Sequence, residues 1–295
     1  MDEQNWLAEK FEAHRPHLRA VAYRMLGSAG EADDAIQEAW LRLSRSDASE
    51  VENLKGWLTT VVARLCLDWL RSRKTRRETP LENAMPDPIV TRVETAPAQD
   101  ELLMSEAVGL AMLVVLETLG PAERLAFVLH DMFGVPFEDI APMVQRTPAA
   151  ARQLASRARR RVQGEAAAPE GDPERQREAV VAFLAAARGG DFEALLRVLD
   201  PDVVLRTDRG AQPGTFQVFK GAKAISEQAV VNSRAGGAVR AVQVNGLPGI
   251  VSYDREGRVS GVLGFVVRGA RILEINVFTD PERLARLDLP ALSDD

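Results

Sequence analysis

Residues 147–163 read TPAAARQLASRARRRVQ, a segment with five arginines and no acidic residue. Thr147 suits the N-cap of a helix, and Pro148 suits the first helical position, where its missing N–H is not needed. The apolar residues that follow recur at helical steps and leave the arginines on the opposite face. These apolar residues are Ala151, Leu154, Ala155, Ala158 and Val162. The pattern predicts an amphipathic helix with one cationic face.

A second, shorter helix is predicted just upstream, over FEDIAPMV at 137–144, and QRT at 145–147 separates the two. This spacing is that of a helix-turn-helix, whose second helix can enter a DNA major groove. The alternative is a solvated arginine-rich helix end, which the helix dipole favours. Solvated faces usually mix both signs of charge, and this one does not. We therefore expect phosphate groups opposite the arginines.

The composition restricts the function classes. The 295 residues carry a net charge of −6, and both halves are slightly acidic, so a nucleic-acid function must rest on local clusters. The single cysteine, Cys66, excludes an intramolecular disulfide, and only three histidines are present, so we expect no metal and no cofactor. No apolar run approaches about 18 residues, which predicts a cytoplasmic protein with neither signal peptide nor membrane span.

Two further predicted helices carry charged faces. WLTTVVARLCLDWL at 57–70 has an apolar stripe and leads into the basic cluster RSRKTRR at 71–77. Trp57 and Trp69 lie close to that stripe, which favours a position in the core over stacking on bases. The helix AGEADDAIQEAWLRL at 29–43 has an acidic outward face, which by itself is typical of solvated surface. That face holds Asp34, Gln37, Glu38 and Leu41.

The rest of the chain is organised differently. Residues 79–100 hold four prolines and no periodicity, which indicates a linker, and GEAAAPEGDPE at 164–174 indicates a second one. After a pair of helices come short β-branched segments separated by turn signals. They read VVLRT, FQVF, AVRAVQV, GIVSY, VSGVLGFVV and ILEINVF. Helices followed by such an antiparallel meander predict an α+β domain with a curved sheet packed on its helices.

The helical part resembles a bacterial RNA polymerase sigma factor of the sigma-70 family, in the extracytoplasmic-function group. ADDAIQEAWLRL and LKGWLTTVVARLCLDWLRSRKTRR resemble region 2, and LGPAERLAFVLHDMFGVPFEDIA with AARQLASRARRRV resembles region 4. The fold expected is therefore multi-domain, with two all-α sigma domains before the α+β domain. The expected divisions are region 2 (1–78), a linker (79–100), region 4 (101–164), a linker (165–174) and a third domain (175–290).

The resemblance implies an alternative sigma factor that binds core RNA polymerase, recognises −35 and −10 promoter elements and initiates transcription in a stress response. The polymerase contacts implied are the clamp helices of the largest subunit and the flap. The clamp contact falls on Asp34, Gln37, Glu38 and Leu41. The loop at 46–55 is expected to form part of a pocket for a flipped base.

The resemblance also implies which basic residues meet promoter DNA. For the −10 element these are Arg64, Arg71, Arg73, Lys74, Arg76 and Arg77. For the −35 element they are Arg146, Arg152, Gln153, Ser156, Arg157, Arg159, Arg160 and Arg161. Within the second set we expect base contacts from Arg152, Gln153 and Ser156, and phosphate contacts from Arg146, Arg157, Arg160 and Arg161.

Residues 175–290 resemble a SnoaL-like domain, a cone-shaped α+β fold related to nuclear transport factor 2. In sigma factors with this extension, the domain is thought to replace a separate anti-sigma protein by contacting the sigma core. The resemblance implies a regulatory contact at Asp208, Arg209 and Gly210, with the linker segment Met85-Pro86-Asp87-Pro88 as the counterpart of the family's linker motif. A small-molecule ligand of the domain is a further alternative.

Two other functions fit part of the sequence. An enzyme would use the polar residues of the third domain, Asp208, Tyr253 and Glu274. That domain has no histidine, no cysteine and no visible pair of nucleophile and base, so we expect no catalytic residue. A DNA-binding repressor would explain the helix-turn-helix but not the strings that resemble region 2.

Overall fold

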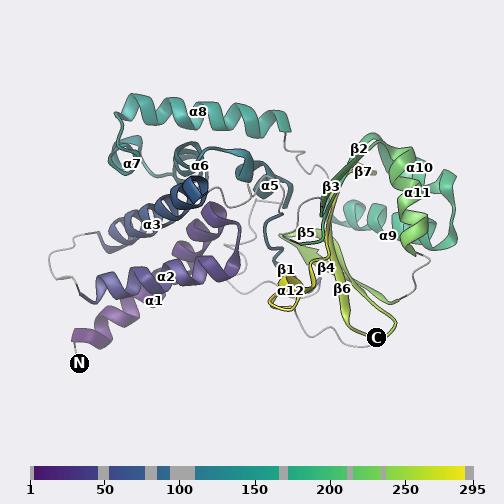
Figure 1. Cartoon of the computed structure of the whole chain (residues 1–295), viewed down its shortest axis with the longest axis horizontal. Coiled ribbons are helices and arrows are strands. Elements are labelled where there is room, and N and C mark those ends of the chain that lie inside the picture. Colours follow the sequence, from purple (N-terminus) through teal and green to yellow (C-terminus); the bar gives the residue numbers. More distant parts are fainter. Residues whose placement is uncertain are drawn as a thin grey trace. The chain divides into compact units, whose positions relative to one another are not determined.

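The computed structural model describes residues 3–45, 53–76, 85–93, 110–165, 172–210, 215–233 and 237–289. The chain folds into two compact units (Figure 1). The described part of the first unit, the helical unit, comprises 3–45, 53–76 and 115–165. The second, the sheet unit, comprises 85–93, 110–114 and the residues from 172 onward. The boundary between the units falls within one helix, α5 (Leu110–Thr118).

The helical unit is built from the helices predicted by apolar spacing. Its helices are α1 (Glu3–Leu26), α2 (Ala29–Leu43), α3 (Leu54–Arg76), α6 (Pro121–Phe127), the π-helix η3 (Val128–Met132), α7 (Phe137–Val144) and α8 (Pro148–Glu165). The predicted stripe of α3 is buried at Leu58, Val62 and Leu65, and Cys66 is buried beside it. Burial raises the pKa of the Cys66 thiol, so this cysteine packs as a small apolar side chain.

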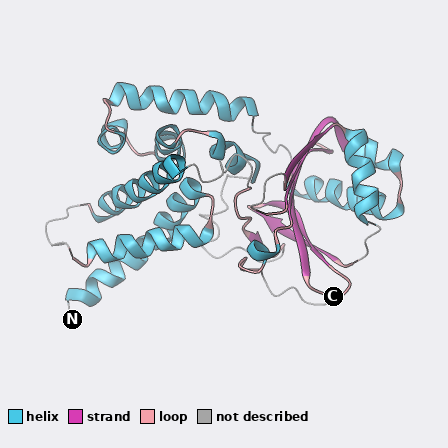
Figure 2. Ribbon diagram, viewed as in Figure 1, coloured by secondary structure: helices cyan, strands magenta, loops and turns pink. Residues whose placement is uncertain are grey.

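The sheet unit contains one curved sheet (Figure 2). Its helices are α9 (Pro173–Gly189), α10 (Phe192–Val198), α11 (Ala222–Ser233) and α12 (Pro281–Leu284). Of these, α9, α10 and α11 lie on one face of the sheet. Its strands are β1 (Val90–Thr91), β2 (Leu199–Asp208), β3 (Phe216–Lys220), β4 (Val239–Val244), β5 (Leu247–Tyr253), β6 (Val259–Arg268) and β7 (Arg271–Phe278). The predicted α+β architecture is therefore confirmed.

The strand order is β1-β4-β5-β6-β7-β2-β3. Strands β4 to β7 form the predicted antiparallel meander. The predicted meander does not extend through all six segments, because β2 runs parallel to β7. The helix α11 and the meander carry the chain from β2 back to its neighbour, and a connection of that length is what a parallel pair requires.

The core of the sheet unit lies between the sheet and α9, α10 and α11. It is formed by Phe183, Leu195, Val203, Phe265, Ile275 and their neighbours, all nearly inaccessible to solvent. The opposite face of the sheet is also apolar, with Val251 and Val262 buried there. Because side chains alternate across each strand, this second face needs a cover of its own.

That cover comes partly from the segment predicted to be a linker. Val90 and Thr91 pair with Val244 and Gln243, so β1 forms an edge strand of the sheet. Met85 is fully buried in the same segment, and the α5 residue Leu110 contacts the second face beside Gly264. Part of the chain that precedes region 4 in the sequence is therefore built into the third domain.

Candidate nucleic-acid and partner interfaces

The helix-turn-helix forms where the sequence predicts it. Gln145 follows α7 in the left-handed conformation, with φ 57° and ψ 48°, and the N–H of Arg146 donates to the carbonyl of Ala141 at 3.0 Å. Thr147 then caps α8, because its hydroxyl accepts a hydrogen bond from the N–H of Ala150 at 3.3 Å. The turn thus ends one helix and starts the next within three residues.

The helix α8 presents the predicted basic face to solvent. Ala151, Ala155, Ala158 and Val162 are buried, whereas Leu154 is only half-buried. All eight residues predicted for −35 contact lie at the surface, six of them exposed and two, Ser156 and Arg159, half-buried.

Some arginines of this face have partners from other helices. Arg157 pairs with Glu123 of α6 at 2.9 Å, and Arg159 pairs with Asp131 of η3. These pairs could not be predicted from the segment itself, since no acid lies within residues 147–163. Only the fold brings the acids of α6 and η3 to α8.

Only some of the residues predicted for the −10 element are among the described residues. Arg64 is exposed, Arg71 lies 3.9 Å from Asp68, and the half-buried Arg73 pairs with Glu31. Lys74 and Arg76 lie in the last turn of α3, but their side chains are outside the described part of the structure. Arg77 and the loop residues 46–52 lie outside it altogether. Trp57 and Trp69 are both half-buried, so neither is enclosed in the core to the extent that the sequence predicts.

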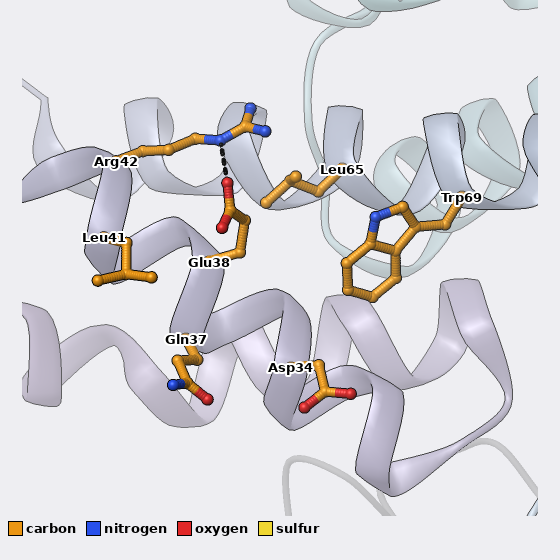
Figure 3. A pocket seen from close by; sticks show the side chains of 7 residues that line it. All are labelled: Asp34, Gln37, Glu38, Leu41, Arg42, Leu65 and Trp69. Carbon is orange, nitrogen blue, oxygen red and sulfur yellow. Dashed lines mark hydrogen bonds and ion pairs between the residues drawn. The ribbon is translucent and has the colours of Figure 1, made fainter.

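A groove of about 460 Å³ runs between α2 and α3 (Figure 3). Its α2 wall carries all four residues predicted for polymerase contact, and Leu41 has 39% of its surface exposed. Arg42 also lines the groove and donates to Glu38 at 2.9 Å. The α3 wall is formed by Leu65 and Trp69, which sequence reasoning assigned only to the core. The groove therefore joins an acidic rim to an apolar wall.

One fully buried arginine joins the two sigma-like parts of the helical unit. Arg124 of α6 is 2% exposed. Its Nη1 donates to the carbonyl oxygen of Met25, near the end of α1, and to Oε1 of Glu117, both at 2.8 Å. The carbonyls of the last turn of a helix have no partner within it, so Arg124 supplies one from a helix far along the chain.

Aromatic contacts lie in the same region. The ring of Phe133 meets that of His17 edge-on, at a centroid distance of 5.2 Å, and the guanidinium of Arg24 lies 5.1 Å from the Phe133 centroid. Burial first, and then the nearby charge of Lys55, lowers the pKa of His17 to about 4. His17 is therefore a neutral packing residue at pH 7.

In the sheet unit, Asp208 holds the linker segment. Its Oδ2 accepts hydrogen bonds from the N–H of Met85 at 2.7 Å and from Arg283 Nη1 at 2.8 Å. Its Oδ1 accepts from the N–H of Gly210 at 3.0 Å. Asp208 itself is 0% exposed. The carboxylate thus fixes its own turn and the linker together.

Arg283 and Asp87 complete this network, and sequence reasoning missed the first of them. The guanidinium of Arg283 donates to Asp87 Oδ1, at 2.9 Å through Nε, and to the carbonyl of Met85 at 2.5 Å through Nη2. Arg283 belongs to α12, whose N-cap is Asp280. Of the other predicted regulatory residues, Arg209 is exposed and forms a main-chain hydrogen bond with Thr215. Ile89 of the linker forms two further bonds, both with Asn245.

The candidate residues for an enzyme have structural partners instead. Glu274 is buried and pairs with Arg206 at 2.6 Å, Asp208 binds the linker, and the ring of Tyr253 lies 5.7 Å beneath the guanidinium of Arg240. Among the described residues, no group of three or more His, Cys, Asp or Glu side chains is arranged to hold a metal ion. Within the same residues, no helix has the length and apolar character needed to cross a membrane.

Comparison with known proteins places these features in a family context. Residues 11–76 match the model of sigma-70 region 2, and residues 110–162 match that of sigma-70 region 4. The probable ECF RNA polymerase sigma factor SigI of Mycobacterium tuberculosis (strain CDC 1551 / Oshkosh) is 35% identical over 285 residues, which span 96% of this chain and 97% of that protein.

A second relative from Mycobacterium tuberculosis (strain ATCC 25618 / H37Rv), the ECF RNA polymerase sigma factor SigJ, is 35% identical over 294 residues. That match spans 93% of this chain and 92% of SigJ. The crystal structure of Mycobacterium tuberculosis SigJ superposes with a TM-score of 0.76 at 32% identity. The superposition covers 95% of this chain and 99% of that one, so the similarity includes all three domains.

Proposed function

The chain belongs to the extracytoplasmic-function group of sigma-70 RNA polymerase sigma factors, and from that premise we propose how its residues divide the work. As a sigma factor it binds core RNA polymerase, recognises −35 and −10 promoter elements and initiates transcription. It works where RNA polymerase works, in the cytoplasm. The observation that supports the division best is an exposed cationic helix-turn-helix and an acid-rimmed groove within one helical unit.

Transcription from a genomic library tests the function as a whole. Core polymerase is mixed with the purified chain, and transcript starts are mapped by sequencing. We expect starts that share two upstream elements and depend on the chain. A repressor that works without polymerase would neither co-purify with core enzyme nor direct any start, and that result would contradict the proposal.

The groove between α2 and α3 is the proposed docking site for the polymerase clamp. Its acidic rim suits basic residues of the partner, and Leu41, Leu65 and Trp69 supply an apolar contact of the kind that dominates binding energy. We expect Glu38→Lys to weaken core binding about tenfold, equivalent to about 1.4 kcal/mol. Glu12→Lys is the matched control, because Glu12 also forms an exposed ion pair within its helix, with Arg15.

The basic residues of α3 are proposed to follow the strand opened at the −10 element. The exposed side chain of Arg64 is the best described of them. We expect Arg64→Ala to slow open-complex formation on a duplex promoter, while a promoter already melted at −10 restores much of the rate. Equal losses on both templates would assign Arg64 to binding of the closed duplex instead.

The outward residues of α8 are proposed to read and grip the −35 element. Arg152→Ala is expected to relax base preference at one upstream position, because an arginine that reads a guanine edge contributes at that base pair. Arg160→Ala is expected to weaken binding to all sequences alike and to reduce its salt dependence. Identical behaviour of the two variants would contradict this assignment.

The SnoaL-like domain is proposed to tune activity through the linker that it holds. The network of Asp208, Arg283 and Asp87 fixes a segment that lies between regions 2 and 4 in the sequence. We expect Arg283→Ala, which frees that segment, to shift open-complex formation in the same direction as truncation after residue 165. Opposite shifts would show that the domain acts by another route.

A small-molecule ligand of the domain is a second, separate proposal. The hydroxyls of Thr207 and Ser226 are buried and have no hydrogen-bond partner among the described residues. Buried polar groups normally have partners, so a polar ligand or ordered water suits these atoms. The test is the melting temperature of the full chain across a metabolite library, where a rise that saturates with concentration supports a ligand. The full chain is needed because β1 belongs to this unit.

A further inference from the structure

We propose that Arg157 and Arg159 brace the recognition helix α8 and do not bind the promoter, with Glu123 and Asp131 as their positioning partners. This inference rests on the proposed role of α8 at the −35 element. It moves Arg157 and Arg159 from DNA contact to positioning of the helix. It leaves Arg152 and the outward edge of the helix, at Gln153, Ser156 and Arg160, to meet DNA.

The two arginines lie on opposite flanks of α8. Residues of a helix advance by about 100° each around the axis, so Arg157 falls on one side of the buried alanine stripe and Arg159 on the other. Gln153 and Arg160 fall directly opposite the stripe, and both are exposed. The braces therefore hold the helix from both sides and leave its outer edge open.

The Arg159 brace is the more enclosed of the two. Both Nε, at 2.8 Å, and Nη2 of Arg159 donate to Oδ1 of Asp131, whose side chain is only 17% exposed. Asp131 stands in the π-helix η3 (Val128–Met132). If Arg159 turned to a phosphate, a partly buried carboxylate would lose its partner, and such a loss is costly.

The other flank has two contacts. Arg157 Nε donates to Glu123 Oε1 at 2.9 Å, and the Glu123 side chain is 23% exposed. Arg161 Nη1 donates at 3.2 Å to the carbonyl oxygen of Thr118, the last residue of α5. The end of a helix carries partial negative charge, so this carbonyl suits a guanidinium. The flank thus links α8 to both α5 and α6.

Arg160 differs from the braced arginines. Its only contact among the described residues is a long one, 3.5 Å from Nε to the carbonyl of Ser156 in its own helix. Its remaining N–H groups therefore face solvent and suit a phosphate, which prefers several donors in a fixed fork. Arg160 is accordingly the matched control for Arg159, one residue away on the same helix.

The test uses holoenzyme formed from core polymerase and the full chain, with a randomised promoter library and with binding measured against salt. For Arg159→Ala and Asp131→Ala we expect the same result: several-fold weaker discrimination across the −35 element with an unchanged salt slope. The exchange Asp131→Arg with Arg159→Asp should restore discrimination. Arg160→Ala should instead lower the slope by about 0.9, the value for one phosphate contact.

The opposite pattern would overturn the brace. If Arg159 bound phosphate, Arg159→Ala would lower the salt slope, Asp131→Ala would tighten binding, and the exchange would place a carboxylate against DNA and abolish it. Arg157 and Glu123 give an independent second pair for the same comparison. A wild-type holoenzyme without any start site would contradict the proposed function instead.

If the wild-type holoenzyme directs no start site, a measurement without DNA still tests the brace. A double-mutant cycle of Arg159 and Asp131 in thermal unfolding of the full chain should show coupling, since the two side chains are in contact. Strictly additive effects of the two substitutions would contradict the brace whatever the promoter data show.

Discussion

Among the described residues, the most deeply buried charge of the helical unit is a cation, Arg124, whereas that of the sheet unit is an anion, Asp208. Arg124 has one charged partner, Glu117, and one main-chain partner, Met25, and its Nε has no partner among the described residues. Asp208 accepts hydrogen bonds on both carboxylate oxygens, including two from main-chain N–H groups. Both charges connect segments far apart in the sequence, but only Asp208 has a hydrogen-bond partner on every polar atom of its side chain.

The comparison shows how differently the two units depend on one side chain. Removal of Arg124 leaves Glu117, 7% exposed, without its cation inside a helical core. Removal of Asp208 leaves Arg283 with Asp87 as a second acid and with access to solvent. We therefore expect the helical unit to be the more sensitive.

The largest effect is expected from Arg124→Ala. Breaking a buried ion pair on one side typically lowers the free energy of unfolding by about 3–5 kcal/mol. All four tryptophans lie in the helical unit, so their fluorescence in urea reports on that unit alone. The double variant Arg124→Met with Glu117→Leu should recover most of the loss. A loss below about 1 kcal/mol would mean that water reaches Glu117 readily, against its burial.

A smaller effect is expected from Asp208→Ala. The lost bonds involve a charged group, and such bonds contribute about 1.5–3 kcal/mol each, part of which solvent and Asp87 replace. Hydrogen exchange at the amides of Met85 and Ile89 should accelerate, while the tryptophan signal stays unchanged. Asp208→Asn is the control that keeps the shape and removes the charge. An unchanged rate of hydrogen exchange at the Met85 amide would show that Asp208 does not hold the linker on the sheet unit.

The helical unit also has a pH-dependent contribution to stability, from the partly buried ring of His17. The pKa of His17 is about 4 in the folded state, below its ordinary 6.5, so folding favours the neutral ring. Its contribution to stability is complete above pH 6.5 and is lost as the pH falls from 6.5 toward 4. One proton gives at most about 1.4 kcal/mol per pH unit, and partial exposure of the ring reduces this. His17→Gln should flatten the tryptophan-detected unfolding profile in that window, and an unchanged profile would assign the dependence to other groups.

The smallest effect is expected from an exposed pair. Arg15 and Glu12 form an ion pair one helical turn apart, at 2.8 Å, with about half of each side chain accessible to solvent. Arg15→Ala should change the free energy of unfolding by no more than about 0.5 kcal/mol, because such pairs are screened by water. A larger loss would mean that burial does not explain why removal of Arg124 costs more stability than removal of a surface arginine.

The sequence predicts the elements whose cause is local. The Thr147 cap, the stripe of α3 and the β-branched segments all depend on neighbours within one helix or strand, and all are present. The family assignment is confirmed by relatives that span nearly the whole chain. The roles given to individual DNA-contacting and polymerase-contacting residues stay predictions, and Arg77 and residues 46–52 lie outside the described residues.

What the sequence could not predict depends on partners far along the chain. Met85 and Val90 look like linker residues because a proline-rich segment without periodicity has no apolar face of its own, yet they pack on a sheet formed some 150 residues later. Arg124 reads as an ordinary helix-surface arginine until α1 and α5 enclose it. The partners of Arg157 and Arg159 are hidden for the same reason.

The captured linker has a consequence for the order of events during synthesis. Asp87 cannot pair with Arg283 until Arg283 has been synthesised, 196 residues later. Ribosomes add about 5–20 residues per second. The delay is therefore about 10–40 s, and the helical unit is complete well before it ends. A core polymerase that meets the nascent chain in this interval meets a sigma factor whose linker segment is not yet held by Arg283.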